Sequence, residues 1–294
     1  MLTDINNNKA NDNKTMTSNL DVFQPPTFIN TDDGNINILQ LTDLHLYLDT
    51  STTTSGINNH QSFVACLNQA LNEDRRCDLI LLTGDLVNEV DTIIYDRVFA
   101  LLQQTGIPFA CLAGNHDVTD EIDNGMSFEQ RQFVAHNADP RLLSRHRIAL
   151  NNWQLLLLDS SVPGKVYGSL GNKNLQWLRQ TLANCHNPVM IAMHHHLLPM
   201  SSAWINAHIT QDSSDFWALI KQFPQVKAVL TGHVHQNFES SKQGVAVYAT
   251  PSTSYQFQPN QDEFGLDTEA KPGYRWLTLT AEGEIDTWVT RIAE

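Results

Sequence analysis

The chain has 294 residues, with 32 acidic against 18 basic side chains and a formal net charge of −14 at pH 7. This length fits one α/β domain with a short tail. The acidic balance argues against a protein that holds nucleic acid through a broad basic surface. It favours a small-molecule partner and a local metal site, because an acidic protein that binds anions needs bound cations as its positive centre.

The four cysteines (Cys66, Cys77, Cys111 and Cys185) show no CxxC spacing, so we expect reduced thiols in a cytoplasmic protein. No segment approaches the roughly 18 consecutive apolar residues of a membrane span, and the N-terminus lacks the basic start and apolar middle of a signal peptide. We therefore expect no membrane partner and a monomer or homodimer.

Residues 1–34 are rich in Asn, Asp and Thr and poor in large apolar side chains. Such a segment buries too little surface to offset the entropy of ordering, so we expect a flexible polar tail before a catalytic domain at 35–294. Apolar strands then alternate with amphipathic helices in a βαβαβ order. The strand segments are 36–43, 78–85 and 107–117, and the helical segments are 63–71 and 93–104.

The second half continues with strands and helices of the same kind. Asn151 and Asn152 predict a turn between two strands within 147–160, and two late hairpins are expected around 245–252 and over 274–292. Further helices are expected at 175–184 and 215–223, and further strands at 188–196 and 226–235. The pattern predicts an α/β fold, a four-layer α-β-β-α sandwich of two mixed sheets flanked by helices.

Every strong polar cluster follows an apolar strand. The clusters are TDLH after NILQL, TGDLVNE after LILL, AGNHD after PFACL, HHH after VMIAM and TGHVH after KAVL. Open α/β sheets bind ligands beyond the carboxyl ends of their strands, so the five clusters are expected to converge on one place.

Each motif alone has a structural alternative. An Asp such as Asp43 at a strand end is commonly a helix cap or turn residue, and Gly114-Asn115-His116-Asp117 also resembles a structural turn. The pair His233-Val234-His235 points two imidazoles the same way, as metal ligands or as surface histidines. Three adjacent imidazoles at 194–196 offer no packing advantage, so metal binding explains them better.

Together the clusters supply imidazoles, carboxylates and one amide, a set that suits Mn, Fe or Zn, and the absence of Cys argues against a structural zinc site. We expect Asp85 to bridge two ions roughly 3.5–4 Å apart, with a shared hydroxide as the nucleophile for in-line attack at phosphorus. Four nearby carboxylates are expected to be solvated loop charges, namely Asp49, Glu89, Asp91 and Asp120.

At these residues the sequence resembles the calcineurin-like metallophosphoesterases, whose pattern D-x-H, G-D, G-N-H-D/E, H and G-H-x-H occurs here in full and in order. The resemblance runs from about Asn35 to the end. The strings HHHLLP followed by Trp204, ATPST with Gln256 nearby, and PGYRWLTL are similar to the bacterial class III 3′,5′-cyclic AMP phosphodiesterases.

The resemblance implies a role for each matching position. One divalent ion is expected on Asp43, His45, Asp85 and His235, and the second on Asp85, Asn115, His194 and His233, with Fe and Mn favoured and Zn as the alternative. Asn115, His116 and Asp117 are the expected catalytic residues, with His116 oriented by Asp117 and donating a proton to the leaving oxygen or holding a phosphate oxygen. Substrate is expected to contact His45, Asn115, His116, His195 and His235.

The expected reaction is hydrolysis of 3′,5′-cyclic AMP to 5′-AMP. The alternatives are another small diester, such as a glycerophosphodiester or a 2′,3′-cyclic nucleotide, and a module that only senses nucleotide or metal. Trp204 is either a face for a nucleobase or a buried aromatic of a surface loop. Ser252 and Thr253 either reach the substrate or end a strand.

Overall fold

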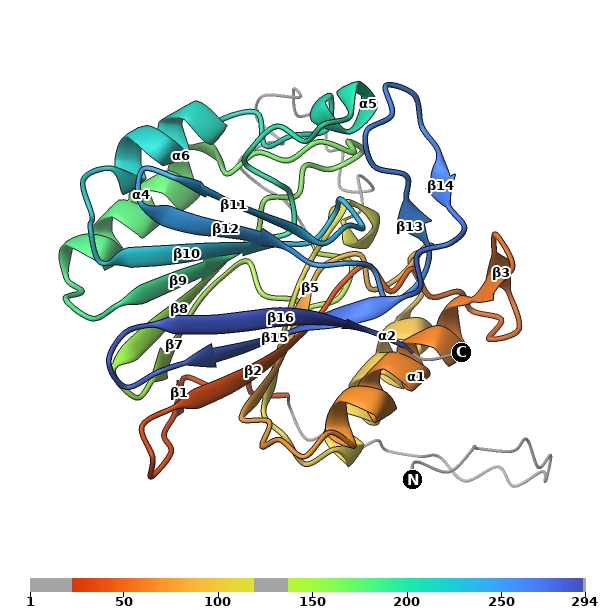
Figure 1. Cartoon of the computed structure of the whole chain (residues 1–294), viewed down its shortest axis with the longest axis horizontal. Helices are drawn as coiled ribbons and strands as arrows, with labels where there is room; N and C mark the ends of the chain where they lie inside the picture. Colours follow the sequence, from red (N-terminus) through yellow and green to blue (C-terminus); the bar gives the residue numbers. More distant parts are fainter. Residues whose placement is uncertain (1–22, 119–136, 293–294) are drawn as a thin grey trace.

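The computed structural model describes residues 23–118 and 137–292. Two large sheets form its centre (Figure 1). The first has seven strands in the order β1 (Phe28–Ile29), β7 (Arg145–Leu150), β8 (Trp153–Leu158), β9 (Val189–Ala192), β10 (Val226–Thr231), β12 (Val245–Ala249) and β11 (Phe238–Lys242). The second has five, in the order β16 (Ile285–Arg291), β15 (Gly273–Leu279), β2 (Ile36–Leu41), β5 (Leu79–Thr83) and β6 (Phe109–Leu112).

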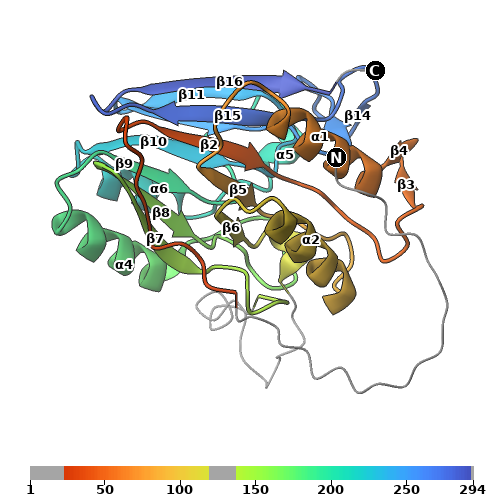
Figure 2. The same ribbon diagram turned by 90° about the horizontal axis from the view of Figure 1, so that it is seen from below.

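Helices cover the outer face of each sheet, which confirms the predicted four layers. Helices α1 (Asn59–Leu71) and α2 (Thr92–Gln104) pack on the five-stranded sheet. Helices α4 (Gly171–Ala183) and α6 (Ser213–Ile220) pack on the seven-stranded sheet. In the turned view of Figure 2, α2 lies beside β5 and β6, and α4 lies on the other side of the molecule near β8 and β9.

Alternation along the buried strands explains why two sheets pack face to face. In β5, Leu79 and Leu81 face the core between the sheets, whereas Ile80 and Leu82 face α1 and α2. Strand β8 divides in the same way, because odd and even side chains of a strand point to opposite faces. The sequence of a strand that is buried on both faces is almost continuously apolar, and the sequence shows this pattern at β5 and β8.

Local signals set the element ends. Asn58 and Asp91 cap α1 and α2 by accepting hydrogen bonds from backbone amides in the first turn. The prediction that Asp91 is a solvated loop charge is therefore wrong, because its carboxylate caps a helix. Asn151, at φ 50°, makes the predicted turn between β7 and β8. The late hairpin predicted over 274–292 is β15–β16. The segment predicted as the other hairpin, around 245–252, contains only β12, which pairs with β11 before it. Small elements complete the chain: β3 (Thr53–Thr54), β4 (Ile57–Asn58), α5 (Ala203–Asn206), β13 (Gln256–Phe257), β14 (Leu266–Asp267) and a 3₁₀ turn at Asn115–Asp117.

The described part of the predicted tail belongs to the folded domain. Phe23 stacks on Phe109 with ring centroids 4.8 Å apart, and β1 pairs in parallel with β7. The flexible-tail prediction is therefore wrong for residues 23–34. Phe23 packs against Phe99 of α2 and Phe109 of β6, and β1 pairs with β7. Its remaining residues, 1–22, lie outside the described chain. Within the described ranges, no helix is both long and apolar enough to cross a membrane.

Candidate metal centre

The five polar clusters meet at one end of the two sheets. Asp43 and His45 follow β2, and Asp85 follows β5. Asn115, His116 and Asp117 follow β6, His194 follows β9, and His233 and His235 follow β10. Because β2, β5 and β6 run parallel in one sheet and β9 and β10 run parallel in the other, their carboxyl ends share an edge. The structure thus brings together every predicted metal ligand.

Five of these residues adopt left-handed backbone conformations. The φ angles are 54° at Asp43, 46° at His45, 51° at Asp85, 68° at His233 and 49° at His235. This region costs a side-chain-bearing residue roughly 1–2 kcal/mol relative to its ordinary conformations. Such strain persists only where the surrounding fold imposes it, and it concentrates at functional sites.

Glycines allow these strand ends to approach one another closely. A Cβ at Gly84 would lie 2.8 Å from Cγ of His194, and one at Gly114 would lie 2.8 Å from Cγ of Asp85. Gly232 is equally close to Asp43, whose Oδ2 would be 2.8 Å from an added Cβ. Each glycine therefore makes room for a candidate ligand at the end of another strand, and Gly84 and Gly232 do so between the two sheets.

One group of ligand atoms consists of Asp43, His45 and His235. Nε2 of His235 lies 3.2 Å from Oδ1 of Asp43 and 3.1 Å from Nε2 of His45. The Nδ1–H of His235 donates to the carbonyl of Tyr255 at 2.8 Å, so its Nε2 carries the free lone pair. Ligand atoms about 2.0–2.1 Å from one ion stand roughly 3 Å apart, so the three side chains fit a common cation.

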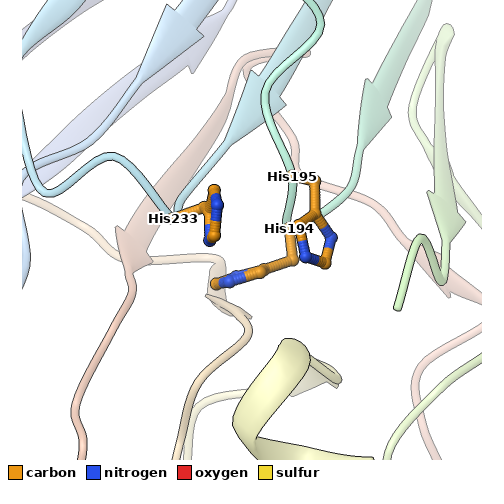
Figure 3. A group of neighbouring side chains, drawn as sticks. All are labelled: His194, His195 and His233. Atoms are coloured by element: carbon orange, nitrogen blue, oxygen red, sulfur yellow. The ribbon is translucent and has the colours of Figure 1, made fainter. Parts of the chain in front are cut away.

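A second group surrounds His194 and shares the carboxylate of Asp85. Nε2 of His194 is 3.4 Å from Oδ2 of Asp85, and its Nδ1–H donates to the carbonyl of Thr83 at 2.8 Å. Within the described chain, Nε2 of His194, Nε2 of His233 and Oδ1 of Asn115 are buried without a hydrogen-bond partner. Unpaired buried acceptors are costly, and a cation would satisfy all three. Figure 3 shows the rings of His194 and His233 converging, with His195 beside them.

The hydrogen bonds distinguish the three adjacent histidines from one another. Nε2–H of His195 donates to the carbonyl of Val166 at 3.1 Å, and its Nδ1 accepts from the hydroxyl of Ser160 at 2.8 Å. Both nitrogens of His195 are thus engaged, so its predicted contact with substrate has no support in these hydrogen bonds. His196 is buried and stacks on His233, with ring centroids 5.6 Å apart. Among the three, His194 is the one aimed at Asp85.

The buried carboxylates make this pocket favour positive charge. Burial alone would lower the pKa of His194, but Asp85 and Asp43 together raise it to about 9. Burial lowers the pKa of His45 to about 3, so this imidazole stays neutral at physiological pH. Burial disfavours ionisation of Asp85, yet His194 and His116 hold its pKa well below the usual value. A cation at this site would displace the His194 proton, because ionised carboxylates and neutral imidazoles are the forms that bind metal.

The contacts of Asp117 and His116 differ from the prediction that Asp117 orients the His116 ring. Asp117 accepts hydrogen bonds from the amides of Leu86 and Gly114 and from the hydroxyl of Tyr95, which ties the strand-end loops together. The His116 Nδ1–H instead donates to the carbonyl of Asn88 at 3.1 Å. A backbone carbonyl holds the ring, and residue types in a sequence give no signal for such a contact.

A cavity of about 300 Å³ opens above the candidate ligands. One wall consists of His45, Asp85, Asn115, His116, His233 and His235. Aromatic side chains outside the sequence motifs form another part of the lining, including Tyr255, Phe257 and Phe264. This volume is at the lower end of the roughly 300–1,000 Å³ typical of small-molecule sites.

The remaining carboxylate and hydroxyl side chains considered from the sequence are not among the candidate metal ligands. Asp49 accepts hydrogen bonds from Ser51, and Glu89 accepts one from the amide of Leu48. The hydroxyl of Ser252 donates to the carbonyl of Asp43, while Oγ1 of Thr253 is buried without a partner in the described structure. Asp120 lies outside the described residues.

The comparisons with known proteins agree with this arrangement. The chain belongs to the calcineurin-like phosphoesterase family, whose pattern it matches over residues 36–237. It is similar to a probable cyclic nucleotide phosphodiesterase of Psychrobacter sp. (strain PRwf-1), with 52% identity over 92% of each chain. The 3′,5′-cyclic adenosine monophosphate phosphodiesterase of Haemophilus influenzae is 36% identical over 88% of this chain and 91% of its own.

Solved structures share the fold at low sequence identity. A dimetal phosphatase from Danio rerio matches with a TM-score of 0.58 and 12% identity, over 88% of this chain and 99% of its own. A purple acid phosphatase from yellow lupin seeds matches with a TM-score of 0.57 and 14% identity, over 87% and 54%. At these identities the likeness concerns the fold alone, and it agrees with the predicted two-sheet architecture.

Proposed function

We propose that this chain is a metal-dependent phosphodiesterase that hydrolyses 3′,5′-cyclic AMP to 5′-AMP. The observation that carries the proposal is the buried set of unpartnered ligand atoms at the floor of a small cavity. The substrate is supported by the similarity to the probable cyclic nucleotide phosphodiesterase of Psychrobacter and to the 3′,5′-cyclic adenosine monophosphate phosphodiesterase of Haemophilus influenzae.

The proposed metal assignment follows the two groups of ligand atoms. Asp43, His45, Asp85 and His235 would hold one divalent ion, and Asp85, Asn115, His194 and His233 would hold the other. Two such ions would neutralise charge on the phosphate and would lower the pKa of bound water, which provides a nucleophile at neutral pH. The donor set of imidazole, carboxylate and amide suits Fe(II) and Mn(II), with Zn(II) as the alternative.

The chain's own residues would position the substrate and handle the proton. Asn115 and His116 both line the cavity, and the bond from Nδ1–H of His116 to Asn88 leaves Nε2 available to substrate. A protonated Nε2 would deliver a proton to the leaving 3′-oxygen. Asp117 would act through the loops, because its three hydrogen bonds fix Leu86 and Gly114 beside the ligands. No side-chain nucleophile is needed.

We also propose a cytoplasmic location. All four cysteines are free thiols, which is the usual state in a reducing compartment. Burial raises the pKa of Cys66 to about 12, so this thiol is inert.

The test is hydrolysis of 3′,5′-cyclic AMP by metal-stripped protein before and after addition of Mn(II), with bis-p-nitrophenyl phosphate as a generic diester. Cleavage of both substrates only with metal is the expected result. Cleavage of the generic diester alone, with metal occupancy verified, would refute the substrate while keeping the reaction class.

A further inference from the structure

The cavity has a second wall that the metal centre does not use. Trp204 on α5 and Phe264 in the loop between β13 and β14 lie on this side, with Phe257 between them and the metal ligands. Phe257 stacks on the His235 ring at 4.0 Å and 14°, so the aromatic wall begins where the ligand wall ends. A substrate whose phosphate lies at the ligands would place its other end against this wall.

Three rings of this wall form one edge-to-face cluster. The ring centroid of Trp204 is 4.9 Å from that of Phe257 and 5.2 Å from that of Phe264, with interplanar angles of 89° and 80°. Separations of 4.5–7 Å at such angles are favourable for aromatic pairs. The hairpin is also tied to α5, because the amide of Gln261 donates to the hydroxyl of Ser202 at 3.2 Å.

Two features of the cluster point to a missing partner. Phe264 is 61% exposed although it is a large apolar side chain beside the cavity. The indole Nε1 of Trp204 is buried, and the described chain offers it no acceptor. A buried N–H without a partner costs about 1–3 kcal/mol, so a ligand that brings an acceptor and a flat apolar face would satisfy both residues.

We propose that Trp204 and Phe264 form a nucleobase subsite that selects phosphodiesters carrying a heteroaromatic base over aliphatic diesters. Phe264 offers its exposed ring for stacking, and the Trp204 N–H donates to a ring nitrogen of the base. Purines combine a π-face with acceptor nitrogens, whereas a glycerophosphodiester has neither an aromatic face nor a ring acceptor. This inference rests on the proposed hydrolysis of 3′,5′-cyclic AMP, and it names the residues that recognise the base.

The test compares steady-state kinetics of Phe264→Ala and Trp204→Phe, with Mn(II) present, on 3′,5′-cyclic AMP and on the same cyclic sugar phosphate without a base. Stacking on aromatic side chains is worth about 1–3 kcal/mol per base, so Phe264→Ala is expected to raise KM for cyclic AMP roughly ten- to a hundredfold. Its kcat should stay near the wild-type value, because the lost contact is equal in ground and transition states. KM for the base-free substrate should not change.

Trp204→Phe keeps a ring and removes the N–H, so a rise in KM of roughly two- to tenfold is expected for cyclic AMP alone. The matched control is Phe28→Ala, because Phe28 is 68% exposed on β1 and is not part of the cavity lining. This control should match the wild type on both substrates.

The possible outcomes distinguish a failure of the base subsite from a failure of the proposed hydrolysis. If wild-type enzyme cleaves cyclic AMP and Phe264→Ala leaves KM unchanged, or raises it equally for the base-free substrate, the base subsite is refuted and the reaction stands. If metal-loaded wild-type enzyme does not cleave cyclic AMP, the proposed function fails and the subsite with it.

Discussion

Replacing Gly114 by alanine tests how tightly the strand ends must pack around the candidate metal centre. The added Cβ would lie 2.8 Å from Cγ of Asp85 and closer still to its backbone nitrogen and Oδ1. Carbon atoms pack at roughly 3.5–4.0 Å, so Asp85 would have to move by about 0.7 Å or more. Overpacking of this kind typically costs about 1–3 kcal/mol of folding stability. Misplacement of a reacting group by about 1 Å can cost 10²-fold in rate, so we expect a loss in kcat of that order.

The assay is metal content together with turnover of bis-p-nitrophenyl phosphate, measured beside the midpoint of thermal unfolding. Gly106→Ala is the matched control, because Gly106 has φ 67° and nothing within 4 Å of an added Cβ. The control should lose about 1–2 kcal/mol of stability and keep its activity. If Gly114→Ala retains the metal content and kcat of the wild type, the close packing does not position Asp85 and the reasoning is wrong.

Three further predictions concern the ions and the proton donor. Asp85→Ala should abolish turnover and lose at least one ion, because this carboxylate lies 3.4 Å from His194 and 3.7 Å from His45. Full activity of this variant would contradict the proposal that Asp85 binds both ions. His116→Ala should keep both ions and slow turnover roughly 10²–10⁴-fold, and an effect on metal content alone would make His116 a ligand. A chelator should lower the unfolding midpoint by roughly 10 °C, because each of the two ions at a hundred times its dissociation constant contributes about 2.7 kcal/mol. An unchanged midpoint after verified metal loss would show that the ions do not stabilise the fold.

The sequence alone determined the layers of the fold and the family. Strand β5 is buried on both faces, so its residues form an apolar run at Leu79, Ile80, Leu81 and Leu82. A pattern over neighbouring residues can be recognised in the sequence without knowledge of the tertiary contacts. Polar residues that follow such runs must converge where parallel strands end, which is why Asp43, Asp85 and the other predicted ligands meet. The assignment of individual ligands to each ion stays a prediction.

Only the tertiary structure decided how the side chains are aimed. His194 faces Asp85 because the carbonyl of Thr83, 111 positions earlier, accepts its Nδ1–H, whereas Ser160 and Val166 engage its neighbour His195. The contact of His116 with Asn88 and the aromatic cluster around Trp204 depend on distant segments in the same way. Every residue has a backbone carbonyl, so the residue types in a sequence do not show which carbonyl accepts a hydrogen bond from a given histidine ring. The exception at the N-terminus has the same cause, because residues 23–34 gain order from partners far along the chain.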